Sequence, residues 1–270
     1  DAKATESNQH LQKFGAYLKD LQRSGKLLFT FDSSTFDKDM NSGMSFDSSI
    51  PQGFGVGSSG ALVAAIYERY ATDKIEFSGQ PNSGEISDLK KIFGQMESYF
   101  HGKSSGLDPL ICYLNLPVLI KSKENMGTVG LPEQDKQGKG AIFLINSGSP
   151  GKTEPMVNIF MEKMKQEGFR NMLKKEFKKY NDACIQAFLK RDISPLFSNI
   201  KELSQLLLNN FTPMIPSVFH KLWKEGIESN AYYLKLCGSG GAGDFLGFTQ
   251  DLDQAKKKLK GYELEVVYSF

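Results

Sequence analysis

Two acidic residues in the first half of the chain, Glu97 and Asp108, stand where a carboxylate could do chemistry. Asp108 follows a turn of small residues (101–107) and precedes an apolar segment, 109–114, that is predicted to be a strand. An acid at such a junction can take the proton of a hydroxyl group. The alternative is an Asp that is satisfied by the N–H groups of its own turn.

Glu97 borders the apolar stripe of its predicted helix, because it follows Phe93 by four residues and precedes Phe100 by three. An unpaired carboxylate at that position would be costly. A lysine or a metal ion could compensate it, and Mg²⁺ prefers oxygen ligands of this kind. An exposed Glu at a helix end is the alternative. The adjacent His101 could act as a base, but packing or hydrogen bonding at the helix end is the commoner role.

The stretch 51–60 (Pro-Gln-Gly-Phe-Gly-Val-Gly-Ser-Ser-Gly) places three alternating glycines before a predicted helix over 58–70. The N–H groups and dipole of a helix start suit a phosphate group. The spacing is neither that of a P-loop nor that of a dinucleotide-binding fingerprint. An ordinary glycine-rich turn is the alternative. A second glycine-rich stretch, 235–244, lies between two predicted strands and could close over phosphates or simply form a hairpin.

Helices and strands that would hold these stretches follow from the apolar periodicity. In the first half we predict a helix over 1–23, strands over 26–32 and 43–49 with a turn at 37–41, a helix from a capping box at Asn82 and Glu85 to His101, and strands over 109–114, 117–121 and 141–146. In the second half we predict helices over 153–189, 193–208, 217–228 and 252–259, and strands over 232–237, 245–249 and 262–268. This mixture predicts an α+β protein of two lobes, 1–150 and 151–270.

Composition excludes several classes of protein. The chain of 270 residues is 40% hydrophobic and has a net charge of +2, which gives no electrostatic case for nucleic acid or a membrane surface. No apolar run approaches the roughly 20 residues of a membrane helix. The three cysteines lack metal-ligand spacing, so we expect reduced thiols in a cytoplasmic protein.

Three stretches, 51–61, 101–108 and 235–243, in this order resemble the motifs of the GHMP family of small-molecule kinases. The segment His101-Gly-Lys-Ser-Ser-Gly-Leu-Asp108 is most similar to that of the mevalonate kinases. The resemblance implies a two-lobed GHMP-kinase-like fold, with a mixed sheet and helices in the N-terminal lobe and a ferredoxin-like C-terminal lobe. It implies ATP and Mg²⁺ as cofactors and the phosphorylation of a small alcohol, foremost mevalonate to 5-phosphomevalonate in isoprenoid precursor synthesis.

The resemblance also assigns roles to residues. Asp108 matches the catalytic base, and Ser59 and Glu97 match the magnesium ligands. Substrate contacts are implied for His101, Ser105, Gly106 and Thr153. The residues implied to bind the ATP phosphates are Gly53, Gly55, Val56, Gly57, Ser58, Ser59, Gly60, Gly238, Ser239, Gly240 and Gly241.

The chain departs from the family pattern in two places. The family's first motif, a strand with a substrate-facing Lys, has no counterpart before residue 51, and we expect an N-terminal piece upstream of Asp1. Gly60 stands where the family usually has Ala, which weakens the helix by ~1 kcal/mol. The alternative functions are that of another kinase of the family, acting on phosphomevalonate, homoserine or a sugar, and that of a non-catalytic nucleotide-binding member. A homodimer is a further expectation.

Overall fold

The computed structural model describes residues 2–49, 57–122, 125–149, 151 and 153–270. These residues form two compact units, the first made of 2–49 and 57–130 and the second starting at Leu131. The expected division near residue 150 therefore lies inside the second unit, because the strand 141–146 belongs to the sheet of that unit. As a boundary between family domains, 150 remains a prediction.

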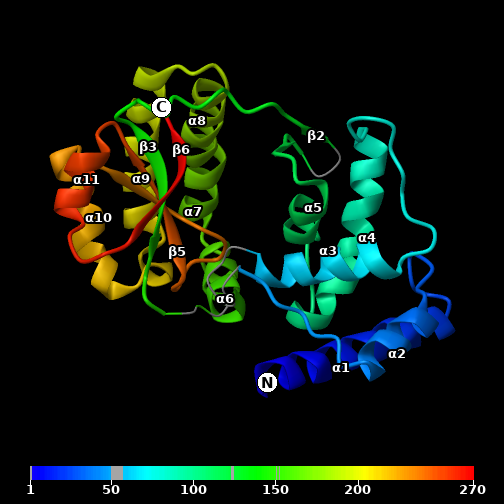
Figure 1. The fold of residues 1–270 in the computed structure, drawn as a ribbon. Coiled ribbons are helices and arrows are strands. Elements are labelled where there is room, and N and C mark those ends of the chain that lie inside the picture. The colour runs from blue at the N-terminus through cyan, green and yellow to red at the C-terminus, as the bar shows by residue number, and fades with distance from the viewer. Residues whose placement is uncertain (1, 50–56, 123–124, 150, 152) are drawn as a thin grey trace. The chain divides into compact units, whose positions relative to one another are not determined.

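The first unit is mainly helical (Figure 1). Its elements are α1 (Ala2–Arg23), α2 (Ser33–Asn41), α3 (Ser58–Tyr70), α4 (Ser83–His101), α5 (Leu107–Leu114), β1 (Val118–Ile120) and β2 (Met126–Thr128). β1 and β2 form a two-stranded antiparallel sheet. The mixed sheet expected in the N-terminal lobe is therefore not present among the described residues of this unit.

Helices α1, α3 and α4 confirm the sequence-based expectations. Apolar residues at helical spacing turn inward on α1 and α4, and they share one core: Leu11, Phe14, Leu18, Ile86, Leu89, Phe93 and Met96. α4 starts at the predicted capping box, because Asn82 Oδ1 accepts from the amides of Gly84 and Glu85 while Glu85 Oε2 accepts from the Asn82 amide. It ends at Gly102, as predicted.

The Asn82 cap gives a prediction for stability. Replacing Asn82 with Ala removes the acceptor for two amides at the start of α4, so we expect the free energy of unfolding to fall by about 1 kcal/mol. The measurement is the urea midpoint at unchanged slope. Asn209→Ala, at an exposed position near the end of a different helix, is the matched control and should not lower the midpoint. An unchanged midpoint for Asn82→Ala would show that the cap adds nothing.

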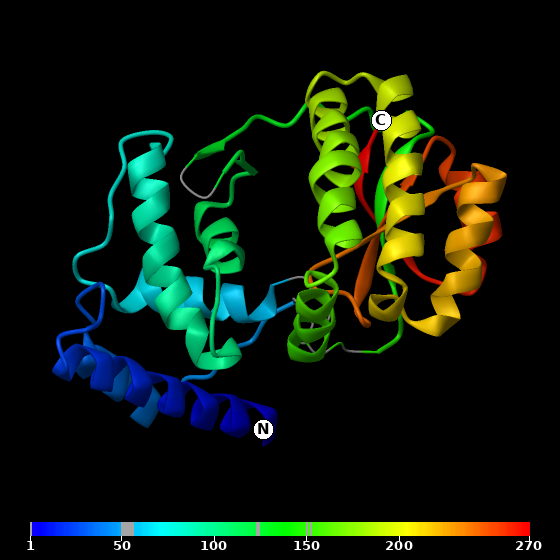
Figure 2. The same cartoon turned by 180° about the vertical axis from the view of Figure 1, so that it is seen from behind.

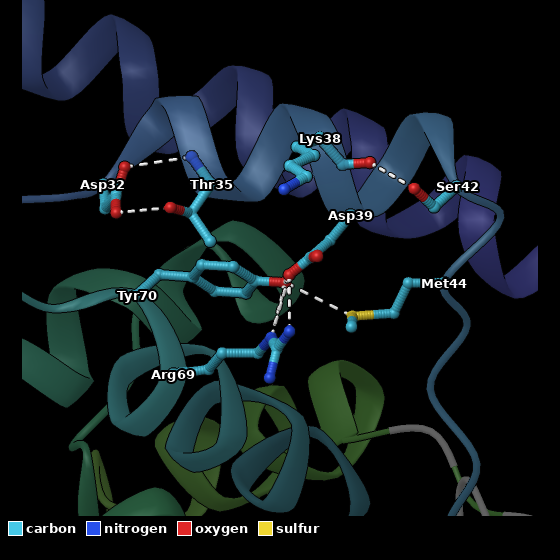
Figure 3. Close-up of polar contacts among 8 residues, drawn as sticks. All are labelled: Asp32, Thr35, Lys38, Asp39, Ser42, Met44, Arg69 and Tyr70. Carbon is cyan, nitrogen blue, oxygen red and sulfur yellow. Dashed lines mark hydrogen bonds and ion pairs between the residues drawn. The ribbon is translucent and has the colours of Figure 1, made fainter.

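Residues 26–49 do not form the two strands that the sequence predicted. Within this segment only Phe31 makes a strand-like bridge, to Ala71, and 33–41 is the helix α2. Asp32 caps this helix, since its carboxylate accepts from the amide and the hydroxyl of Thr35 (Figure 3). Phe36 and Met40, four residues apart, are buried beneath it. The segment 37–41, predicted as a turn, is thus the second half of a helix.

Asp39 fixes α2 against the end of α3 (Figure 3). Its Oδ2 atom accepts from Tyr70 Oη at 2.8 Å and lies 2.8 Å from an Arg69 guanidinium nitrogen. The hydrogen bonds from Tyr70 and Arg69 hold the pKa of Asp39 below its usual range. These contacts anchor the last turn of α3 to α2, and the start of α3 takes no part in them.

The second unit contains the larger sheet. Its elements are β3 (Ala141–Asn146), α6 (Thr153–Lys163), α7 (Glu167–Met172), a π-helical turn η1 (Leu173–Phe177), α8 (Lys178–Leu189), α9 (Ile193–Asn210), a 3₁₀ turn η2 (Thr212–Met214), α10 (Ser217–Ser229), β4 (Tyr233–Leu236), β5 (Asp244–Thr249), α11 (Leu252–Lys258) and β6 (Leu264–Ser269). These agree closely with the predicted helices and strands of this half.

The sheet has the order β4-β5-β3-β6, and every neighbouring pair is antiparallel. In chain order, one strand, a set of helices, two strands, a helix and a last strand follow one another, which is the ferredoxin-like succession. Helices α8 and α9 lie over one face of the sheet (Figure 2). The core of this unit is rich in aromatic side chains, and Phe143 of β3, Phe219 and Trp223 of α10, and Phe245 of β5 are fully buried. The expected α+β class and the ferredoxin-like second lobe are confirmed.

In the part of the chain that the structure describes, the helices are too short or too polar to cross a membrane.

Candidate active site

The start of α3 is arranged to receive an anion. Gly57 occupies the cap position with a left-handed backbone (φ 85°), and no side chain caps the helix. The Ala61 amide bonds to the Gly57 carbonyl at 3.0 Å. In the described residues the amides of 58–60 have no hydrogen-bond partner, so they are the donors that a helix start offers to a phosphate. Of the glycine stretch, Gly53, Gly55 and Val56 lie outside the described residues.

Asp108 lies in the first turn of a helix, not at the start of a strand. Gly106 caps α5 with a left-handed backbone (φ 72°), and the expected strand over 109–114 is wrong. Leu110 and Leu114, four residues apart, are buried. Pro109 does not break the helix, because the first turn needs no intrahelical hydrogen bond from that amide. The helix places Asp108, which is exposed as a whole residue, in its first turn.

Two glycines, Gly57 at the cap of α3 and Gly60 in its first turn, let Asp108 approach the start of that helix. A Cβ atom added to Gly57 would lie 3.5 Å from Asp108 Cβ and 3.9 Å from Asp108 Oδ2. A Cβ atom at Gly60 would lie only 2.6 Å from the Asp108 carbonyl carbon and 2.7 Å from Pro109 N. The starts of α3 and α5 therefore touch backbone to backbone. Gly60, which departs from the family's usual Ala, is explained by this close approach.

Glu97 is buried, with 3% of its surface exposed, so the alternative of an exposed helix-end Glu is wrong. Its Oε1 atom accepts from Ser59 Oγ at 2.9 Å. Its Oε2 atom accepts from Ser104 Oγ. His101 Nε2 lies 3.0 Å from Ser59 Oγ. The structure thus brings together Ser59 of α3 with Glu97 and His101 of α4. The motifs predicted that Ser59 and Glu97 act together, whereas the substrate contact predicted for His101 remains a prediction.

Ser59 and Glu97 fit a magnesium ion. Among the described residues no group of three or more His, Cys, Asp or Glu side chains could hold a metal alone. Mg²⁺ typically takes one or two protein oxygens and completes its shell with water and nucleotide phosphates. A carboxylate and a hydroxyl 2.9 Å apart, beside a helix start with free amides, provide such a partial set.

The groups around Asp108 change the pKa of its carboxyl group. Neighbouring protein atoms desolvate its carboxyl group and raise its pKa, although the residue as a whole is exposed. The negative charge of Glu97 raises the pKa further, whereas His101 lowers it. A base with a raised pKa binds a proton more readily. One helical turn onward, burial and then Asp108 and Glu97 raise the pKa of the Cys112 thiol, so it is a poor nucleophile.

Sequence reasoning chose Ser105 and missed Ser104. Ser105 is exposed, and its hydroxyl oxygen accepts from the Leu107 amide at 3.4 Å. Ser104 is the serine that contacts Glu97, and its oxygen accepts from the Gly106 amide at 3.0 Å. Gly106 is buried, so its amide holds the Ser104 hydroxyl from the interior of the protein. Because the two serines are adjacent, the periodicity of the sequence does not predict which of them contacts Glu97.

The second glycine-rich stretch forms the β4–β5 hairpin of the second unit. Gly238, Gly240 and Gly241 all have positive φ values, of 56°, 76° and 86°. A Cβ atom at Gly240 would lie 2.6 Å from the Met214 carbonyl oxygen, and the Gly241 amide donates to that oxygen at 2.6 Å. The turn is thus folded back on η2. Phosphate binding by this turn, Ser239 included, remains a prediction.

The segment before α6 lies beside this turn. A Cβ atom at Gly151 would be 3.3 Å from the Ala242 amide nitrogen, and the Gly243 amide donates to the Ser149 carbonyl at 2.9 Å. Thr153, the remaining predicted substrate contact, is the first residue of α6. Its role remains a prediction.

Comparisons with known proteins agree with the motifs. Residues 19–115 match the family model of the GHMP kinases N terminal domain. No curated protein sequence matches the chain. Among solved structures, the Lin0012 protein from Listeria innocua superimposes with a TM-score of 0.55 at 18% identity, covering 76% of this chain and 62% of that chain.

Two kinase structures are similar in the same way. Streptococcus pneumoniae phosphomevalonate kinase, in complex with phosphomevalonate and AMPPNP, has a TM-score of 0.56 at 14% identity and covers 79% of this chain and 69% of its own. L. major mevalonate kinase, in complex with R-mevalonate, has a TM-score of 0.55 at 15% identity and covers 79% and 66%. The present chain thus spans about two thirds of the length of these structures.

Residues 19–115 thus match the N terminal domain of the GHMP kinases, and the fold of the chain is similar to those of two kinases that carry phosphomevalonate and mevalonate. The similarity to the fold of the L. major mevalonate kinase agrees with the resemblance of the segment 101–108.

Proposed function

We propose that this protein transfers the γ-phosphoryl group of MgATP to the hydroxyl group of a small alcohol, and that the alcohol is mevalonate. The observation that carries the proposal is the cluster at the start of α3. There the buried Glu97 shares a hydrogen bond with Ser59, and the Asp108 carboxylate lies against Gly57. The substrates named for the two kinase structures above, mevalonate and phosphomevalonate, support this substrate class.

Each group has a role that follows from its place. The amides of Gly57, Ser58, Ser59 and Gly60 hold the ATP phosphates at the helix start. Ser59 and Glu97 would hold a magnesium ion, which would supply neutralisation of the charge on the phosphates. Asp108 takes the proton of the substrate hydroxyl as the oxygen–phosphorus bond forms and ADP leaves. His101, whose Nε2 atom lies 3.0 Å from Ser59 Oγ, holds that hydroxyl beside Glu97.

The test is a product assay with a panel of acceptors. The purified protein is incubated with MgATP and mevalonate, phosphomevalonate, homoserine or galactose, and ADP release and the phosphorylated product are measured. We expect 5-phosphomevalonate as the main product. Phosphorylation of another acceptor would overturn the substrate, and MgATP binding in a thermal-shift experiment with no turnover on any acceptor would overturn the activity. Cytoplasmic location, isoprenoid precursor synthesis and a homodimer belong to this proposal.

The magnesium assignment gives a second prediction. Glu97→Gln keeps the shape of the side chain but removes its charge, so we expect the Mg²⁺ concentration for half-maximal activity to rise roughly 10–100-fold. The measurement is a Mg²⁺ titration at fixed ATP. Glu85→Gln, on the same helix but at its other end, is the control and should leave the titration unchanged. An unshifted titration for Glu97→Gln would remove Glu97 from the metal site.

A further inference from the structure

The hydrogen bonds around Glu97 can be assigned a direction. A carboxylate only accepts, and each serine hydroxyl has a single proton. Ser59 and Ser104 therefore both donate to Glu97. It follows that His101 carries its proton on Nε2 and donates to Ser59 Oγ, while the Gly106 amide donates to Ser104 Oγ. Two chains of donors converge on one buried carboxylate, one on each oxygen.

Ser104 is the more firmly held of the two serines. Its amide donates to Ser98 Oγ at 3.2 Å, and Ser98 Oγ donates to the Gly94 carbonyl at 2.6 Å. The loop carrying it packs closely on α4, because a Cβ atom at Gly106 would lie 2.2 Å from the Lys90 carbonyl oxygen. Ser104 is thus connected to α4 on one side and to the cap of α5 on the other. Ser59, in contrast, stands at the open start of α3.

We propose that Ser104 is a positioning residue for the metal ligand Glu97. By donating to Oε2, it fixes the plane of the carboxylate and leaves Oε1 and Ser59 Oγ as the oxygens that would hold the cation. Through the Gly106 cap it also ties Glu97 to the helix that carries Asp108, two residues further on. Groups that hydrogen-bond to a metal ligand typically change metal affinity 10–100-fold when they are removed. This inference rests on the proposed function.

The test is a set of variants at Ser104. We expect Ser104→Ala to raise the Mg²⁺ concentration for half-maximal activity about tenfold, with kcat at saturating Mg²⁺ within about twofold of the parent. Ser104→Thr keeps the hydroxyl and should restore much of the affinity. Ser87→Ala, on α4 outside the cluster, is the matched control and should behave like the parent. An unshifted Mg²⁺ titration for Ser104→Ala would overturn the inference.

A binding measurement separates positioning from catalysis. Calorimetric titration with AMPPNP over a range of Mg²⁺ concentrations should show the same shift as the kinetics, without turnover. In the Glu97→Gln background, Ser104→Ala should add little, since residues that act through one another are not additive. Equal, additive losses in both backgrounds would overturn the inference.

The two proposals fail in different ways. If Glu97→Gln leaves the Mg²⁺ dependence unchanged, the metal site of the proposed function is wrong and the role of Ser104 falls with it. If Glu97→Gln shifts the dependence and Ser104→Ala does not, only the role of Ser104 is wrong. Should Ser104→Ala fail to unfold cooperatively, Ser104→Cys, which keeps the volume with a weaker donor, is titrated instead, and it too should need more Mg²⁺.

Discussion

We expect the replacement of Asp108 with Asn to lower kcat by roughly 10²–10⁴-fold, with little change in the affinity for MgATP. Asn has nearly the same shape as Asp but cannot take the proton of the substrate hydroxyl. The phosphate-binding amides at the start of α3 and the pair Ser59 and Glu97 are untouched by the change, so nucleotide binding should persist. The measurements are steady-state kinetics and calorimetry with AMPPNP and Mg²⁺.

The environment of Asp108 determines in which direction kcat changes with pH. Desolvation and the charge of Glu97 raise the pKa of its carboxyl group above the usual range of an Asp. The base is active only when it is ionised, so kcat falls as the pH falls through this raised pKa. The acidic limb of the kcat profile should therefore lie above the range of an ordinary Asp, and it should disappear in Asp108→Asn.

Asp88→Asn is the matched control for this experiment. Asp88 is an exposed residue on α4 that pairs with Lys91 at 2.8 Å. Pairs of this kind contribute little to stability, and the site does not include it. The control should keep the activity of the parent, and near-normal turnover by Asp108→Asn would rule out its role as the base.

Replacing Gly60 with Ala lowers stability by about 1–3 kcal/mol and kcat by about 10²-fold. The added methyl group would lie 2.6 Å from the Asp108 carbonyl carbon and 2.7 Å from Pro109 N. Both are backbone atoms, which no side-chain rotation can clear. The starts of α3 and α5 must therefore move apart, and this movement displaces Asp108 from the phosphate-binding turn. Urea unfolding and kcat are measured on the same preparation.

Gly168→Ala is the matched control, and we expect it to act in the opposite direction. Gly168 lies in the helix α7, and nothing is within 4 Å of its added Cβ atom. Ala favours a helix over Gly by up to ~1 kcal/mol, so this variant should be as stable as the parent or more stable. If Gly60→Ala also leaves stability and kcat unchanged, the close approach of α3 and α5 has no functional meaning.

Local signals allowed accurate prediction where the chain itself supplied them. The start of α3 follows from Gly57 and the two serines after it, and the start of α4 follows from the Asn82 and Glu85 box. Both are settled by residues within one helical turn. Most helices and strands of the second unit were predicted for the same reason, because their apolar periods are long and unbroken.

The errors of prediction arise where a segment fits the period of a strand as well as that of a helix, or where a proline suggests that no helix is present. Phe29 and Phe31 alternate like a strand, and both are buried, yet no neighbouring strand among the described residues pairs with them except through the single bridge of Phe31. In 33–41 the cap at Asp32 and the burial of Phe36 outweigh the turn-like composition. Pro109 concealed a helix start, because proline is tolerated in a first turn.

The composition of the site was predictable, but its internal contacts were not. The motifs identified Ser59, Glu97 and Asp108 correctly as neighbours in space. No local pattern shows that Ser104 faces Glu97 while Ser105 faces solvent, because that depends on how the loop packs on α4. The reason for Gly60 is likewise a contact between two helices distant in sequence.

Under the proposed function, the orientation of α4 would favour the metal-complexed form of the nucleotide. Glu97 and His101 lie in the last turns of this helix, where the aligned peptide dipoles leave a partial negative charge. The start of α3, beside them, carries the opposite partial charge. Uncomplexed ATP would bring its phosphates toward a buried carboxylate and a negative helix end at once. The metal-complexed nucleotide would present each helix end with the complementary sign, so we expect the protein to bind it in preference to free ATP.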